Sequence, residues 1–183
     1  MTPLRPDRPL IAALQGAASS EIQRLLAEFA AKLSREGLRV GGVVEIGVAA
    51  PGGACGSLKL RDLQTGELFP ISQNLGSGSQ ACNLDGRGVI AACAAVERAL
   101  AEGLDLLVLS KFGKLEADRS GLYDAFRLAA ASGTPLLTAV SPAMAEVWGG
   151  FAGPLFEFLP ASASAVEAWW RPSPAEIAAI AAE

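Results

Sequence analysis

Residues 105–116 read DLLVLSKFGKLE, in which the uncharged run LLVL lies between Asp105 and Ser110. A short apolar run of this kind is typical of a strand buried on both faces, as the strands of a parallel sheet are. Residues 38–46 are rich in valine and flanked by glycines, and residues 135–140 are another apolar run, so both stretches also predict strands. Because parallel neighbours are joined by crossover helices, these three strands predict a sheet that is covered by helices.

Outward from this strand, apolar spacing and turn residues predict alternating strands and helices. Ser20 and Gln23 predict a capping box for a helix that ends at Gly37. Residues 57–71 alternate polar and apolar side chains and predict an antiparallel hairpin at a sheet edge. The other expected elements are strands at 9–14 and 155–159, helices at 85–102 and ending at Gly133, loops at 49–56 and 111–120, and one or two short helices in the tail. The pattern predicts an α/β fold, with a doubly wound, mostly parallel sheet in one domain over residues 1–183.

The composition excludes several function classes. Hydrophobic residues make up 51% of the 183 residues and charged residues 19%, which favours a well-filled core over disorder. The chain has no histidine, so Ser-His-Asp catalysis, Cys-His catalysis and histidine metal ligands are excluded. A net charge of −4 without a basic cluster argues against nucleic-acid binding.

Cysteine usage and hydropathy predict a cytoplasmic protein. Three scattered cysteines, with no secretory signal before them, favour a reducing compartment: Cys55, Cys82 and Cys93. We expect Cys93 to serve packing in its helix. The uncharged stretch 128–145 is interrupted by glycine and proline and predicts no membrane span. The sequence does not decide whether the protein forms homo-oligomers.

The loop 15–20 follows the first expected strand and opens a helix, which makes it a candidate anion site. Gly16, Ser19 and Ser20 would supply its donors. A phosphate-binding loop of the form G-x-x-x-x-G-K-[ST] needs glycine, lysine and a hydroxyl where this sequence has EIQ at positions 21–23. The loop is therefore either a weak anion site or an ordinary strand-to-helix turn.

The residues that follow strand 105–110 resemble the thermophile-type nucleoside-triphosphatase family of P-loop proteins. In that family the strand ends in Asp-Glu, followed by an apolar residue, Gly and Lys. Here Ser110 and Lys111 stand at the acidic positions, before FGK at 112–114. The layout also matches at GLRVGGVVE (37–45), LRDLQTGE (60–67) and SGTPLLTAV (132–140). The resemblance implies a three-layer P-loop NTPase-like fold with degenerate Walker motifs.

The chain resembles more closely the bacterial domain-of-unknown-function family 2478. The resemblance is carried by PISQNLG (70–76), CNLD (82–85), LLVLSKFGKLEA (106–117) and LTAVSP (137–142). It implies no particular chemistry, since that family has no established activity. It does imply a link to molybdate, because some members are encoded near molybdate-transport genes.

The departures from the P-loop pattern favour binding over hydrolysis. Acidic residues at the end of this strand hold Mg²⁺ in P-loop NTPases, which Ser110 and Lys111 do not do. Lys111 or Lys114 would instead bind an oxyanion directly, and Ser110 is a further candidate ligand-binding residue beside them. In the alternative interpretation, Lys111 pairs with Asp118 or Asp124, and Lys114 and Glu116 are solvated loop charges.

The polar loop 72–85 is a third candidate site. Ser77, Gly78 and Ser79 offer hydroxyl and backbone N–H donors of the kind that can surround an anion. Polar loops of this length are uncommon in compact domains unless they bind something or are disordered. A plain flexible loop has the same composition, and its Cys82 is either a helix-end thiolate or an ordinary thiol.

We expect a non-hydrolytic binding or accessory protein that takes molybdate, phosphate or a nucleotide at the mouth formed by the loops 15–20, 72–85 and 110–116, with no metal and no catalytic residue. One alternative is an active nucleoside-triphosphatase or phosphotransferase in which Glu116, Asp85 or Glu45 serves as base or metal ligand. Another is a structural protein that has kept only the fold. The paired Trp169 and Trp170 cover the core or form a partner surface.

Overall fold

The computed structural model describes residues 9–48, 57–73, 83–84 and 86–171 of the chain. Seven strands form its main sheet: β1 (Ile11–Gln15), β2 (Val40–Val48), β3 (Ser57–Asp62), β4 (Leu68–Pro70), β7 (Leu106–Leu109), β8 (Leu136–Ala139) and β9 (Phe156–Pro160). They lie in the order β4-β3-β2-β7-β8-β1-β9. The strands from β2 to β9 in this order are parallel, and β3 and β4 add an antiparallel hairpin at one edge. The predicted mostly parallel sheet with an inserted hairpin is confirmed.

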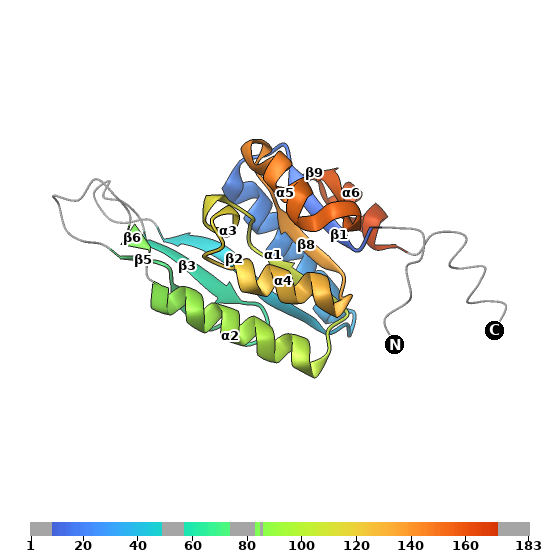
Figure 1. The fold of residues 1–183 in the computed structure, drawn as a ribbon. Coiled ribbons are helices and arrows are strands. Elements are labelled where there is room, and N and C mark those ends of the chain that lie inside the picture. The colour runs from blue at the N-terminus through green and yellow to red at the C-terminus, as the bar shows by residue number, and fades with distance from the viewer. Residues whose placement is uncertain (1–8, 49–56, 74–82, 85, 172–183) are drawn as a thin grey trace.

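Helices cover both faces of this sheet and give the structure three layers (Figure 1). On one face lie α1 (Ser19–Arg35) and α6 (Ala163–Trp170); on the other lie α2 (Gly86–Glu102), α4 (Tyr123–Ser132) and α5 (Ala145–Ala152). Figure 1 shows α2 and α4 side by side. The shorter elements are α3 (Lys114–Ala117), single turns of 3₁₀ helix at Pro142–Met144 and Gly153–Leu155, and a small sheet of β5 (Ser72–Gln73) and β6 (Asn83–Leu84).

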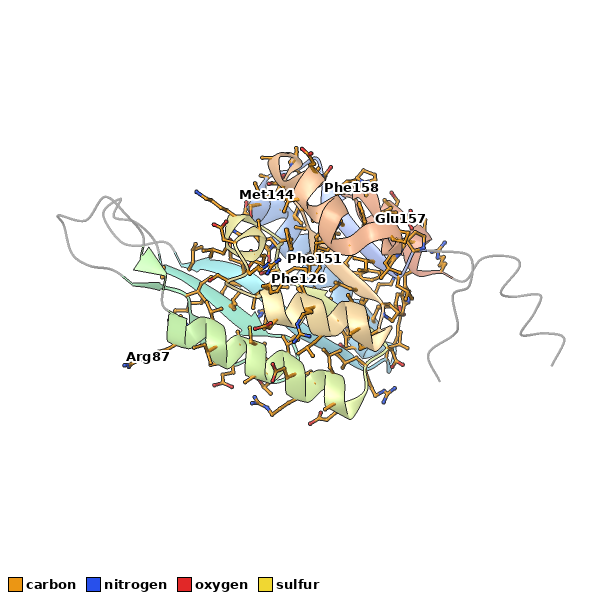
Figure 2. All side chains as sticks on the ribbon, viewed as in Figure 1. Arg87, Phe126, Met144, Phe151, Glu157 and Phe158 are labelled. Atoms are coloured by element: carbon orange, nitrogen blue, oxygen red, sulfur yellow. The ribbon has the colours of Figure 1, made fainter. Side chains whose placement is uncertain are left out.

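An aromatic cluster fills the core on the face covered by α2, α4 and α5. It consists of Phe112, Phe126, Trp148 and Phe151, with ring centroids between 5.0 and 6.4 Å apart. Figure 2 labels Phe126 and Phe151, which meet in this layer from α4 and α5. Because Phe112 lies three residues after the end of β7, the cluster anchors the segment that follows this strand.

The tryptophan pair of α6 covers the core on the opposite face. Trp169 is buried, and its Nε1 donates a hydrogen bond to the carbonyl oxygen of Pro9 at 3.2 Å. Trp170 is half-buried and meets the Phe29 ring of α1 edge to face, with centroids 6.4 Å apart. Of the two roles expected for this pair, covering the core is therefore confirmed.

Two local predictions are wrong. α1 does not begin with a Ser20–Gln23 capping box, because Ala18 is the N-cap and its N–H donates to the Glu21 carboxylate at 3.1 Å. Glu21 lies at the third helical position, from which an acidic side chain reaches back to the N-cap. The expected loop 111–120 contains the helical turn α3.

The cysteine and membrane predictions have mixed outcomes. Cys93 is half-buried in α2 and its Sγ donates to the carbonyl oxygen of Gly121 at 3.7 Å, while burial raises the pKa of the thiol. Its predicted packing role is confirmed, and Cys55 and Cys82 lie outside the described residues.

Among the residues the structure describes, no helix has the length and apolar character to cross a membrane.

An ion pair ties α6 to α1. Lys32 Nζ lies 2.5 Å from Glu167 Oε1, and Arg171 Nη2 lies 3.2 Å from Glu167 Oε2. The Lys32 ammonium, through its hydrogen bond and its charge, lowers the pKa of Glu167 from the ordinary value of 4.5. A carboxyl whose pKa is lower in the folded state stabilises the fold above its unfolded pKa. That contribution is lost as pH falls through the folded value.

We therefore expect Glu167→Gln to flatten the loss of stability that wild type shows as pH falls below about 4.5. Urea unfolding across the acid range measures this slope. Glu28→Gln is the matched control, because Glu28 is an exposed carboxylate whose partner, Arg24, lies on its own helix. An acid limb as steep in Glu167→Gln as in wild type would contradict the prediction.

Candidate functional site

A pocket of about 350 Å³ lies at the carboxyl ends of β1, β7 and β8. Ligands of open α/β sheets bind at this edge of the sheet, in the crevice outside the strand ends. Three segments line the pocket: Gln15, Gly16, Ala17, Ser19 and Ile22 from the β1–α1 turn, Lys111, Phe112 and Gly113 after β7, and Ala139, Val140, Ser141 and Pro142 after β8.

Backbone hydrogen bonds fix these three walls relative to one another. The Phe112 N–H donates to the carbonyl oxygen of Ala139 at 2.8 Å, and the Val140 N–H donates to that of Leu14 at 3.1 Å. Gly16 has a φ of +91°, which a glycine adopts without steric cost, and this residue turns the chain from β1 into α1. The pocket is therefore built on the rigid part of the sheet.

The β1–α1 wall presents hydrogen-bond donors. The N–H groups at positions 19–21 precede the first intrahelical bond, which runs from the Ile22 N–H to the Ala18 carbonyl oxygen, and of these three residues only Ser19 lines the pocket. Gln15 Nε2 is buried and has no hydrogen-bond partner among the described residues. A buried amide without a partner costs free energy, which a ligand acceptor in the pocket would recover.

Lys111 is held by a carboxylate of the neighbouring strand. Its Nζ lies 2.8 Å from Oε2 of Glu45, and the side chains are 45% and 12% exposed respectively. The predicted alternative partners, Asp118 and Asp124, are wrong, because β2 and β7 are parallel neighbours and bring Glu45 to the same end of the sheet as Lys111. Asp124 lies instead 3.6 Å from Arg127.

Gln23 of α1 bridges the two strands that carry this ion pair. Its Nε2 donates to the carbonyl oxygen of Ser110 at 2.6 Å, and its Oε1 accepts the Glu45 N–H at 2.8 Å. The backbone pairing of β2 with β7 ends at Val43 and Leu109. Beyond that point the Gln23 side-chain amide supplies the hydrogen bonds that connect the two chain segments. Gln23 thus fixes the backbone beside both members of the pair.

Glu116 has a structural role in the loop after β7. It is buried, its Oε2 accepts the Gly113 N–H at 2.9 Å, and its Oε1 accepts the Leu122 N–H at 2.8 Å. These bonds close the turn around α3. In the part of the chain that the structure describes, no group of three or more acidic or cysteine side chains is placed to hold a metal ion.

The structure brings together some of the predicted site residues. Gly16, Ser19 and Lys111 line the pocket, whereas Ser20 and Lys114 are exposed residues outside its lining. Ser110 is buried at the end of β7. The predicted donors of the polar loop lie outside the described residues, as does one acid of the hydrolase alternative: Ser77, Gly78, Ser79 and Asp85.

Sequence reasoning missed two polar residues of the pocket, Gln15 and Ser141. Gln15 is the last residue of β1, and Ser141 lies two residues after the end of β8; both strands belong to the parallel part of the sheet. The rule that the carboxyl ends of parallel strands share one edge would have pointed to both.

The fold and part of the sequence are similar to known proteins. The crystal structure of THEP1 from the hyperthermophile Aquifex aeolicus superposes with a TM-score of 0.60 at 12% identity, over 87% of this chain and 93% of that one. The molybdenum import ATP-binding protein ModC 2 of Bradyrhizobium diazoefficiens is 40% identical over 166 residues, which are 91% of this chain and 18% of that protein. The chain therefore spans less than a fifth of this relative. Residues 11–169 match the family described as "Protein of unknown function (DUF2478)", and the chain belongs to that family.

Proposed function

We propose that this protein binds an oxyanion in the pocket between β1, β7 and β8, without hydrolysing it, and acts as an accessory protein in molybdate handling. The oxyanion is either free, as molybdate or phosphate, or the terminal phosphate of a nucleotide. The observation that carries the proposal is Gln15, a residue of the pocket lining whose buried amide nitrogen has no partner among the described residues.

The donor set suits an oxyanion. Helix N-termini and uncharged amide or hydroxyl donors bind phosphate-like groups well, because N–H dipoles converge on the negative oxygens. Gln15, Ser19 and Ser141 line the pocket, which lies beside the start of α1, and Lys111 adds a cation to the lining. The Glu21 carboxylate, which accepts the Ala18 N–H at the start of α1, lies outside the pocket lining.

The residues at the start of α1 support binding without hydrolysis. At the positions of the P-loop lysine and hydroxyl this chain has Ile22, which is buried, and Gln23, whose amide is used by the two strands. At the Mg²⁺-binding strand end it has Ser110 and Lys111. Magnesium-assisted phosphoryl transfer would have to use other groups.

The link to molybdate rests on the relative's name. A molybdenum import ATP-binding protein contains a segment 40% identical to 91% of this chain, within a much longer polypeptide. A segment joined to an import protein in one organism is well suited to assist the same process as a separate chain. This supports an accessory role, with molybdate as the first ligand to test.

We expect Gln15→Leu to weaken oxyanion binding about ten-fold while leaving thermal stability unchanged or higher, because the amide nitrogen has no partner among the described residues. Isothermal titration calorimetry with molybdate measures the affinity. Thr138→Val is the matched control: Thr138 Oγ1 is also buried without a partner among the described residues, but Thr138 does not line the pocket. Equal affinities of Gln15→Leu and Thr138→Val would contradict the assignment of the site.

Parallel titrations with sulfate, phosphate, ATP and GTP distinguish a free oxyanion from a nucleotide phosphate. No binding of any of these at millimolar concentration would overturn the proposed function. Magnesium-dependent release of phosphate from ATP or GTP would contradict its non-hydrolytic part and favour the hydrolase alternative.

A further inference from the structure

Lys111 lines the pocket, and its ammonium is paired with a carboxylate that does not. The residue is part of the pocket lining, whereas Glu45, whose Oε2 lies 2.8 Å from Lys111 Nζ, is not. A lysine ammonium sits on a flexible four-carbon stem, so it can move between two acceptors at small cost. The Lys111 side chain is 45% exposed, which leaves room for that movement.

Glu45 is the fixed member of this pair. Its side chain is only 12% exposed, and its own N–H is held by the Gln23 amide, which is buried and also anchored to Ser110. An exchange of partners would therefore move the lysine and leave the carboxylate in place.

We infer that Glu45 competes with the bound oxyanion for Lys111, and that this competition sets the affinity and charge selectivity of the pocket. The inference rests on the proposed function. An oxyanion in the pocket recruits the ammonium only if its attraction exceeds that of Glu45. A dianion attracts the ammonium about twice as strongly as a monoanion at the same distance. Molybdate, sulfate and hydrogen phosphate are therefore selected over monoanions of similar size such as perchlorate.

Because of this competition, the effects of substitutions at Glu45 and Lys111 on ligand affinity should not be additive. Glu45→Gln keeps the shape and the backbone hydrogen bond but removes the competing charge, and we expect it to bind molybdate about five-fold more tightly. It should also narrow the preference for molybdate over perchlorate. Lys111→Met should weaken molybdate binding, and adding Glu45→Gln to Lys111→Met should produce no further tightening.

The test is a double-mutant cycle by calorimetric titration with molybdate and perchlorate at constant ionic strength. Glu102→Gln is the control for loss of one negative charge, because Glu102 is exposed at the end of α2 that leads into β7, at the opposite edge of the sheet. Tighter binding in Glu45→Gln than in wild type, lost when Lys111→Met is added, supports the inference. If wild type binds and Glu45→Gln leaves the affinity unchanged, the inference is overturned while the proposed function stands. The same holds if Glu45→Gln and Glu102→Gln tighten binding equally. Absence of wild-type binding overturns both the proposed function and the inference.

Discussion

Replacing Gly42 by alanine is expected to lower the free energy of unfolding by about 3 kcal/mol or more, a large effect for the addition of one methyl group. A Cβ at this position would lie 1.9 Å from the carbonyl oxygen of Val108 and 2.9 Å from its nitrogen. Gly42 also has a φ of +117°, which side chains of L-residues rarely adopt. Both costs apply at once.

The atoms around Gly42 cannot shift easily to remove this steric clash. Gly42 and Val108 are register partners in the parallel pair β2–β7, so the colliding atoms are backbone atoms near the middle of the sheet. The Gly42 carbonyl oxygen also accepts the Leu63 N–H at 2.9 Å, which ties the residue to the hairpin turn. To admit the methyl group, β2 would have to separate from β7.

Gly47→Ala is the matched control for this substitution. Gly47 lies on the same strand, and a Cβ there would meet no heavy atom within 4 Å. We expect a change in the free energy of unfolding within about 0.5 kcal/mol, as for other surface positions. Urea denaturation followed by far-ultraviolet circular dichroism measures both variants. Similar midpoints for Gly42→Ala and Gly47→Ala would refute the close approach of β2 to β7.

The layout of the fold could be predicted because it depends on local patterns. The run 106–109 is apolar at every position, as a strand covered on both faces must be, and the alternation over 57–71 reports a strand pair at an edge. The start of α1 could not be predicted in the same way. Ser20 with Gln23 and Ala18 with Glu21 both have the spacing of a cap, and only the three-dimensional use of Gln23 decides between them.

The candidate site was predictable as a place and not as a set of contacts. The rule for strand ends gives the loops of Gly16 and Lys111. It does not give the partner of Lys111, because Glu45 is distant in sequence and becomes a neighbour only through the order of the strands. Gln15 carries no motif, and its significance comes from an amide that the fold buries without a partner among the described residues.

Gln23 is the residue for which the sequence interpretation and the structure differ most, and its substitution gives the second large effect. We expect Gln23→Leu to lower the free energy of unfolding by about 2–4 kcal/mol. Leucine has nearly the same volume, so no cavity forms. The substitution removes both hydrogen bonds of the side chain, at 2.6 Å to Ser110 and at 2.8 Å from Glu45, and leaves a buried carbonyl and a part-buried N–H unpaired.

The matched control is Gln64→Leu, which makes the same chemical change on an exposed turn residue and should alter stability by less than about 0.5 kcal/mol. Hydrogen exchange separates the specific effect from general destabilisation, since the Glu45 N–H loses its acceptor in Gln23→Leu but not in Gln64→Leu. Unchanged protection of the Glu45 N–H in Gln23→Leu would show that another group satisfies it. If Gln23 holds β2 and β7 together beside the pocket, Glu45→Gln should no longer raise the affinity for molybdate once Gln23→Leu is present. The reason is that a carboxylate on a loosened strand does not compete for Lys111 from a fixed position.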